Sequence, residues 1–217
     1  MCVRGASRVY PGSEASENGD AHRMTEKAAR EPQSAYLLRV SLQGIDPEIW
    51  RIVLVPEDHT LAYLHVILQT VMNWLDCHLH QFEIGGKSYG RPDYDEDAED
   101  LLDERAVKLR EVLAALKKLF LYRYDFGDEW QLELRVTQVL PYDARTHYPQ
   151  CVDGGRSAPP EDVGGVPGYE RLLEAIVDPS DEEHRELLEW IGGAFDAEEF
   201  DLEFVNFELR KIFRLLD

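Results

Sequence analysis

Two segments of alternating apolar residues lie near the middle of the chain and are joined by a short turn rich in Asp and Gly. Every second residue of the segment 130–136 is apolar, and residues 118–124 precede it across the turn that contains Asp125 and Asp128. A period of two places alternate side chains on one face of a strand, and Asp and Gly are favoured in tight turns. The pattern predicts an antiparallel hairpin with one face in a core.

The same period of two occurs earlier in the chain. Residues 36–42 and 50–54 alternate on either side of a Gly/Pro turn, and residues 78–84 alternate before a Gly-Gly turn. These segments predict two further hairpins. Between them, apolar residues recur at helical spacing after Thr60, which predicts an N-capped helix over the sheet. His65 lies on the apolar face of this helix and is interpreted as a hydrogen-bonded core histidine.

The remaining segments differ in character. The segment from Pro92 to Glu104 is almost wholly acidic and predicts a solvated loop, followed by a short helix at 109–116. The Pro/Gly-rich segment 141–168 predicts an ordered loop without regular structure, a kind of segment that often carries function. Helices are expected at 169–177, up to Ile191 behind a Ser180/Glu183 capping box, and near the end of the chain.

These elements define the expected architecture. We predict one α+β domain over residues 36–217, with a mostly antiparallel sheet built from hairpins, covered by helices, and a helical C-terminal part. Residues 1–35 lack periodic apolar positions and predict a disordered tail. No segment has the roughly 18 uninterrupted apolar residues of a membrane span, and the three scattered cysteines cannot form a disulfide framework. A cytoplasmic protein without membrane contact is expected.

The charge balance bears on the class of partner. The chain has 43 acidic and 23 basic residues and a formal net charge of −20, and residues 1–35 are neutral, so the excess belongs to the folded part. A field of this sign repels a polyanion, which argues against direct nucleic-acid binding. The charge could equally serve solubility alone.

Two pairs of polar residues are candidates for a site near the strands. His78 and His80 are expected on one strand with both imidazoles on the same face, a geometry that can supply two ligands to a divalent metal. The alternative is two histidines hydrogen-bonded at a sheet end. Asp125 and Asp128 could bind a cation or act as an acid/base pair, although turn chemistry alone also selects Asp there.

A third pair lies in the segment PPEDVGG at 159–165. There Glu161 and Asp162 follow two prolines and precede two glycines. The segment predicts a rigid turn that presents two carboxylates. It could equally be a structural clasp between the strands and the helical end, because Pro and Gly serve backbone geometry first.

Several motifs occur in an order that resembles the plasmid pRiA4b ORF-3-like family. They are GIDPEIWR at 44–51, HLHxF at 78–82, YDFGDxW at 124–130, PPEDVGG at 159–165 and the segment 190–206. The resemblance covers residues 36–209 and implies an accessory protein linked to plasmids or mobile elements. Members often carry a His after the motif Trp and a Cys before the Gly pair, where this chain has Gln131-Leu132 and Val163. These departures lower the expectation of a metal.

Some members of that family carry the label of resolvase. A serine recombinase needs an activated Ser among arginines and a basic DNA-reading element. Here Ser41, Ser88, Ser157 and Ser180 are expected in a strand, a turn, a loop and a helix cap, and the sequence has no basic helix. Recombinase activity is therefore not expected.

Three functional hypotheses follow. The first is a non-enzymatic binding or accessory protein with a polar groove that takes a protein partner or a small ligand. The groove is formed by His78, His80, Asp125, Asp128, Glu161 and Asp162. The alternative is a metal-dependent hydrolase that uses the same His and Asp groups, with Glu161 or Asp162 as general base. A third is an acidic mimic of nucleic acid.

Overall fold

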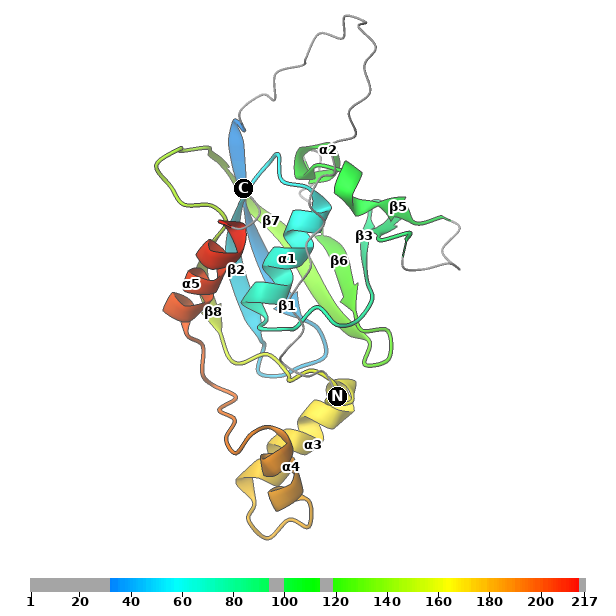
Figure 1. Ribbon diagram of the computed structural model, residues 1–217, viewed down its shortest axis with the longest axis vertical. Helices are drawn as coiled ribbons and strands as arrows, with labels where there is room; N and C mark the ends of the chain where they lie inside the picture. The colour runs from blue at the N-terminus through cyan, green and yellow to red at the C-terminus, as the bar shows by residue number, and fades with distance from the viewer. Residues whose placement is uncertain (1–31, 94–99, 114–118, 215–217) are drawn as a thin grey trace, which may run out of the picture.

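The computed structural model describes residues 32–93, 100–113 and 119–214. Its centre is an eight-stranded sheet in the order β5-β4-β3-β6-β7-β1-β2-β8. Every pairing is antiparallel except that of β4 with β5. Five α-helices accompany the sheet in the described parts of the chain. The α+β class, the mostly antiparallel sheet and the helical C-terminal part are as predicted (Figure 1).

The three predicted hairpins are present. Their strands are β1 (Ser34–Leu42) with β2 (Trp50–Pro56), β3 (His80–Ile84) with β4 (Lys87–Gly90), and β6 (Leu119–Tyr124) with β7 (Trp130–Pro141). The third hairpin lies between the other two, because β6 pairs with β3 and β7 pairs with β1. In β7, Trp130, Leu132 and Leu134 are buried, as the period of two predicts.

The first helix covers one face of the sheet. Helix α1 (Leu61–Val71) begins after Thr60, whose side chain accepts a hydrogen bond from the Tyr63 amide at 3.3 Å. Figure 1 shows α1 lying across the central strands. Its apolar side chains join one continuous core with Tyr122, Tyr124 and Trp130 of the sheet. Burial of such large rings stabilises the packing of α1 on the sheet.

The Pro/Gly-rich segment differs from the prediction, because it contains strand β8 (Gln150–Gly155) at the edge of the sheet beside β2. Its Gly154 lies against Arg51 and Phe200, so a side chain at that position would collide with both. Strand β8 shows no period of two, because Gly154 and Gly155 interrupt it. The expectation of no regular structure there was wrong.

The C-terminal helices are α3 (Gly165–Val177), α4 (His184–Trp190) and α5 (Leu202–Phe213). Helices α3 and α4 pack together beyond one end of the sheet, and α5 packs on β8 (Figure 1). The predicted capping box does not form, because the amide and hydroxyl of Ser180 both donate to the Asp178 carboxylate. Helix α4 accordingly begins later, at His184.

Smaller elements complete the described chain. The acidic segment ends in β5 (Leu102–Asp103) and the 3₁₀ turn η1 (Glu104–Ala106), followed by helix α2 (Leu109–Leu113). The expected tail lies outside the described residues apart from residues 32–35, of which Ser34 and Ala35 already belong to β1. In the described parts of the chain, none of the helices has the length and apolarity to cross a membrane.

Candidate functional site

The side chain of His78 faces three carboxylates. Its Nε2 lies 3.1 Å from Asp162 Oδ1, 3.5 Å from Asp125 Oδ2 and 3.8 Å from Glu161 Oε2. These four residues, termed the His78 cluster below, come from the bend before β3, the β6–β7 turn and the loop before α3. The fold thus brings together four of the six residues predicted for the groove.

Asp125 is fixed by the turn that it begins. It follows β6 in a left-handed backbone conformation, with φ of 54°. Its Oδ1 accepts hydrogen bonds from the amides of Gly127 at 3.0 Å and Asp128 at 3.3 Å. The side chain is buried, and its other oxygen faces His78. Turn chemistry and site geometry therefore depend on the same carboxylate.

Glu161 is held in the same manner by one of its oxygens. Oε1 accepts hydrogen bonds from the Leu75 amide at 2.5 Å and the Tyr124 hydroxyl at 2.9 Å, which leaves Oε2 toward His78. Burial is the largest cause that raises the pKa of Glu161, and the charge of Asp162 adds to it. The indole of Trp74 donates to Pro159 O at 3.1 Å and so anchors the loop that carries Glu161.

Asp128 lies next to the cluster but serves the backbone. Its Oδ2 accepts a hydrogen bond from the Gly164 amide at 3.0 Å. Gly165 lies so close to the carbonyl of Asp128 that a Cβ there would be 2.6 Å from its oxygen. Asp128 thus fastens the β6–β7 turn to the start of α3, which fits the clasp interpretation of this loop.

His80 does not share the site of His78. His78 precedes the strand, so the period of two does not relate the two side chains. His80 Nε2 lies 2.8 Å from Glu104 Oε2, and its ring stacks on that of His65 with centroids 3.6 Å apart. The expected metal pair of His78 and His80 is therefore divided between two clusters.

The second cluster is internally paired. His65 Nε2 lies 2.8 Å from Asp76 Oδ1, and its Nδ1 lies 2.8 Å from the Tyr122 hydroxyl. His65 is thus a hydrogen-bonded core histidine, as predicted. Glu104 was expected in a solvated loop, but it is 1% exposed. Its acidic surroundings in the sequence gave no signal of this burial, since the pairing with His80 spans 24 residues.

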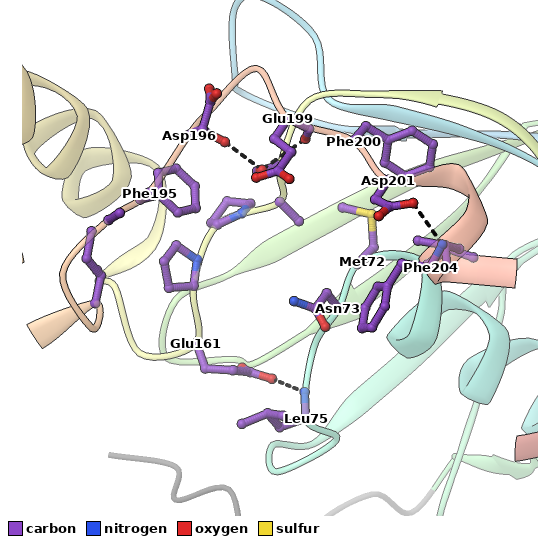
Figure 2. A pocket seen from close by; sticks show the side chains of 18 of the residues that line it. Met72, Asn73, Leu75, Glu161, Phe195, Asp196, Glu199, Phe200, Asp201 and Phe204 are labelled. Carbon is purple, nitrogen blue, oxygen red and sulfur yellow. Dashed lines mark hydrogen bonds between the residues drawn. The ribbon is translucent and has the colours of Figure 1, made fainter. Parts of the chain in front are cut away.

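A pocket of about 560 Å³ lies beside the His78 cluster, and Glu161 and Asp162 belong to both. Its other walls come from the end of α1, the loop after α4 and the start of α5. Figure 2 shows Phe195, Phe200 and Phe204 bordering this pocket, together with the hydrogen bond from Leu75 to Glu161. Sequence reasoning did not assign this pocket, although the family-like segment 190–206 supplies much of it.

The charged residues of the pocket are mostly acidic. Among the described residues, its lining contains five carboxylates and one guanidinium: Glu161, Asp162, Asp196, Glu199, Asp201 and Arg51. Arg51 is 2% exposed and donates to the backbone carbonyls of Val71, Trp50 and Gly155 at 2.7–2.8 Å. Its guanidinium also lies 4.2 Å from the Phe200 ring centre, and burial lowers its pKa to about 10. Arg51 is therefore engaged in holding the pocket together.

The fold and the site define an α+β protein in which a histidine–carboxylate cluster adjoins an aromatic pocket. The model of the plasmid pRiA4b ORF-3-like protein family matches residues 34–204, and the chain belongs to this family. The resemblance inferred from the motifs is thereby confirmed.

Two relatives extend this comparison. An uncharacterized protein, y4hQ, from Sinorhizobium fredii is 36% identical over 178 residues, which is 80% of this chain and 87% of that protein. The crystal structure of MM3350 from Methanosarcina mazei Go1, a protein of unknown function, has a TM-score of 0.73 and 40% identity. It covers 79% of this chain and 96% of its own. The family and its fold are thus shown, and neither relative carries an assigned activity.

Proposed function

We propose that this protein is a non-enzymatic binding protein whose ligand site is the aromatic pocket beside the His78 cluster. The ligand carries a positive charge on an apolar stem, such as an arginine or lysine side chain of a protein partner or a small organic amine. The observation that carries the proposal is the combination of aromatic walls with five carboxylates in one pocket. An accessory role linked to plasmids or mobile elements is in keeping with the family name.

Both features of the pocket favour a cation. Aromatic faces attract guanidinium and ammonium groups, and carboxylates supply the opposite charge. The volume of about 560 Å³ is within the range of ordinary ligand pockets. An anionic ligand would find one guanidinium, and Arg51 already donates from Nε and Nη1 to three carbonyls. The net charge of −20 adds long-range attraction for a basic partner.

The hydroxyls of Ser157 and Ser180 support a binding role over recombination. Ser157 Oγ donates to the carbonyls of Asp196 and Glu199, and Ser180 Oγ donates to Asp178. The carbonyls that Ser157 binds cannot act as the base that a recombinase nucleophile requires, and the Asp178 carboxylate accepts from both the amide and the hydroxyl of Ser180, as in a turn. The resolvase label of some family members therefore plays no part in the proposal.

The proposal can be tested with single amino-acid probes. An N-acetylated, C-terminally amidated arginine and the corresponding glutamate are titrated into the isotopically labelled full chain and followed by NMR. We expect arginine to shift the amides of the pocket with a Kd on the order of 1 mM, which corresponds to about −4 kcal/mol. The glutamate probe should leave these amides unchanged. Shifts by both probes, or by neither, would refute a cation-selective pocket.

Two phenylalanines of α5 provide a matched pair of variants. Phe204 borders the pocket and is 50% exposed, whereas Phe207 is 56% exposed and does not line it. Phe204→Ala should weaken arginine binding about fivefold, because one cation–π contact contributes roughly 1 kcal/mol. Phe207→Ala should leave the Kd unchanged. Equal effects of the two variants would place the ligand outside the pocket.

The metal-dependent hydrolase remains a second candidate because of one observation, the convergence of three carboxylates on His78. That reaction would use a metal to activate water, with a carboxylate of the cluster as base. Its first requirement is metal binding, which can be measured without any substrate. The nucleic-acid mimic stays a prediction from charge alone.

A further inference from the structure

The His78 cluster has the spacing of a metal coordination shell. The ligand atoms of His78, Asp125 and Asp162 all lie within 4.8 Å of one another. Two atoms that are each about 2.1 Å from a metal lie about 3.0 Å apart at a right angle and about 3.4 Å apart at a tetrahedral angle. His78 Nε2 lies 3.1 Å from Asp162, within this range, and 3.5 Å from Asp125, which is about 0.1 Å beyond the tetrahedral value.

The contacts between His78 Nε2 and the carboxylate oxygens are not ordinary hydrogen bonds. In the described parts of the chain, His78 Nε2 is one of three buried side-chain polar atoms that lack a hydrogen bond. The carboxylate oxygens lie near it but outside hydrogen-bond geometry. A buried polar atom without a partner is costly, and a bound cation would remove that cost.

The carboxylates are held in position before any ligand arrives. Asp125 and Glu161 each bind backbone or phenol donors with one oxygen and present the other to His78. Asp162 has a left-handed backbone, with φ of 60°, that ends the PPED turn. Three carboxylates around one imidazole repel one another unless a positive charge neutralises them. Ligand atoms that are already held in position need little further ordering when they bind a cation.

The neighbouring histidine cluster provides a contrast. His65 and His80 also lie among carboxylates, with His65, Asp76 and His80 close enough to share an ion. However, His65 Nε2 is bonded to Asp76, and His80 Nε2 is bonded to Glu104, each at 2.8 Å. The Nε2 atom of each ring has a partner, so we interpret this cluster as structural. The two clusters thus contain the same residue types, and they differ in whether the imidazole Nε2 atom has a hydrogen-bond partner.

We propose that His78, Asp125 and Asp162 bind one divalent first-row cation, Zn²⁺ or Mn²⁺, beside Glu161. One imidazole nitrogen with carboxylate oxygens suits these ions. Glu161 Oε2 lies 3.8 Å from His78 Nε2 and stays outside this group of three ligands. Because Glu161 and Asp162 also line the pocket, the ion lies at its edge. The proposal is independent of the ligand of the pocket.

The test measures metal binding by the full chain alone. Protein purified without chelator is analysed for metal content, then stripped and titrated with Zn²⁺ and with Mn²⁺ by calorimetry. We expect about one equivalent of one of these ions at a saturable site. His78→Gln and Asp125→Asn should each weaken its binding by at least about tenfold. Asp125→Asn retains Oδ1 for the amides of Gly127 and Asp128, so the turn is preserved.

A surface histidine serves as the matched control. His147 is exposed and lies outside the cluster, so His147→Gln should bind the ion as the unaltered chain does. Circular dichroism and thermal unfolding verify that all three variants fold. The proposal is overturned if the unaltered chain binds well below one equivalent of Zn²⁺ and also well below one equivalent of Mn²⁺. It is equally overturned if the two cluster variants bind normally, or if His147→Gln reduces binding to the same extent.

Discussion

Replacing Glu104 with alanine should lower the free energy of unfolding by about 3 kcal/mol, because removal of one partner leaves the other group of a buried pair without compensation. The Glu104 and His80 side chains are 2% and 7% exposed, and Oε2 and Nε2 lie 2.8 Å apart. In a domain of this size, that loss corresponds to a melting temperature lower by roughly 6–12 °C. Glu104→Gln preserves the shape and an acceptor and should cost less.

The assay is thermal and urea unfolding of the full chain, followed by circular dichroism. Glu170→Ala is the control, because Glu170 is exposed on α3 and its replacement should change stability by less than about 0.5 kcal/mol. If Glu104 lay in a solvated acidic loop, as the sequence predicted, Glu104→Ala would change stability as little as Glu170→Ala. Equal and small effects of the two substitutions would therefore refute the buried pairing.

Three further predictions concern stability. Arg51→Met should lower the free energy of unfolding by about 3–4 kcal/mol in urea titrations, because one buried and two partly buried carbonyls lose charged donors; a loss below about 1 kcal/mol would contradict this. Gly168→Ala should cost more than about 3 kcal/mol, since its Cβ would lie 1.9 Å from the Val163 carbonyl oxygen, whereas Gly192→Ala, in open space, should cost about 1–2 kcal/mol for its left-handed backbone alone. Burial and His80 lower the pKa of His65 below 6.5. The unfolded chain therefore binds more protons below about pH 6.5, and the stability due to neutral His65 is lost on acidification. When the pH is lowered from about 7.5 to 5.5, the melting temperature of the unaltered chain should thus fall more than that of His65→Gln. Equal decreases for the two proteins would contradict the lowered pKa of His65.

The sequence predicted those elements whose signals are local. The period of two located the three hairpins, and helical spacing behind Thr60 located α1, since both patterns reflect one buried face. Strand β8 escaped detection because Gly154 and Gly155 provide no side chains to alternate. The Ser180 capping box failed because Asp178, two residues away, competes successfully for the Ser180 hydroxyl.

The candidate site was predicted in composition and only partly in arrangement. His78, Asp125, Glu161 and Asp162 do meet, but no local pattern specifies contacts of His78 with residues 47 or more positions away in the chain. His80 was misplaced as a metal partner because its register with His78 assumed that the strand begins two residues earlier. Glu104 was missed for a related reason, since its burial depends on that same strand. Long-range pairing is what the sequence leaves undetermined.

The strand order has a consequence for how the protein folds. The hairpin β1–β2 and the hairpin β3–β4 are made first along the chain, yet they are not neighbours, because β6 and β7 lie between them. The two hairpins therefore cannot join into one sheet until the residues through Pro141 are available, and such non-local pairing slows folding. During synthesis the two early hairpins would have unpaired strand edges, and such edges promote aggregation. Because β6 and β7 pair late, His78 contacts its carboxylates only after the sheet has formed.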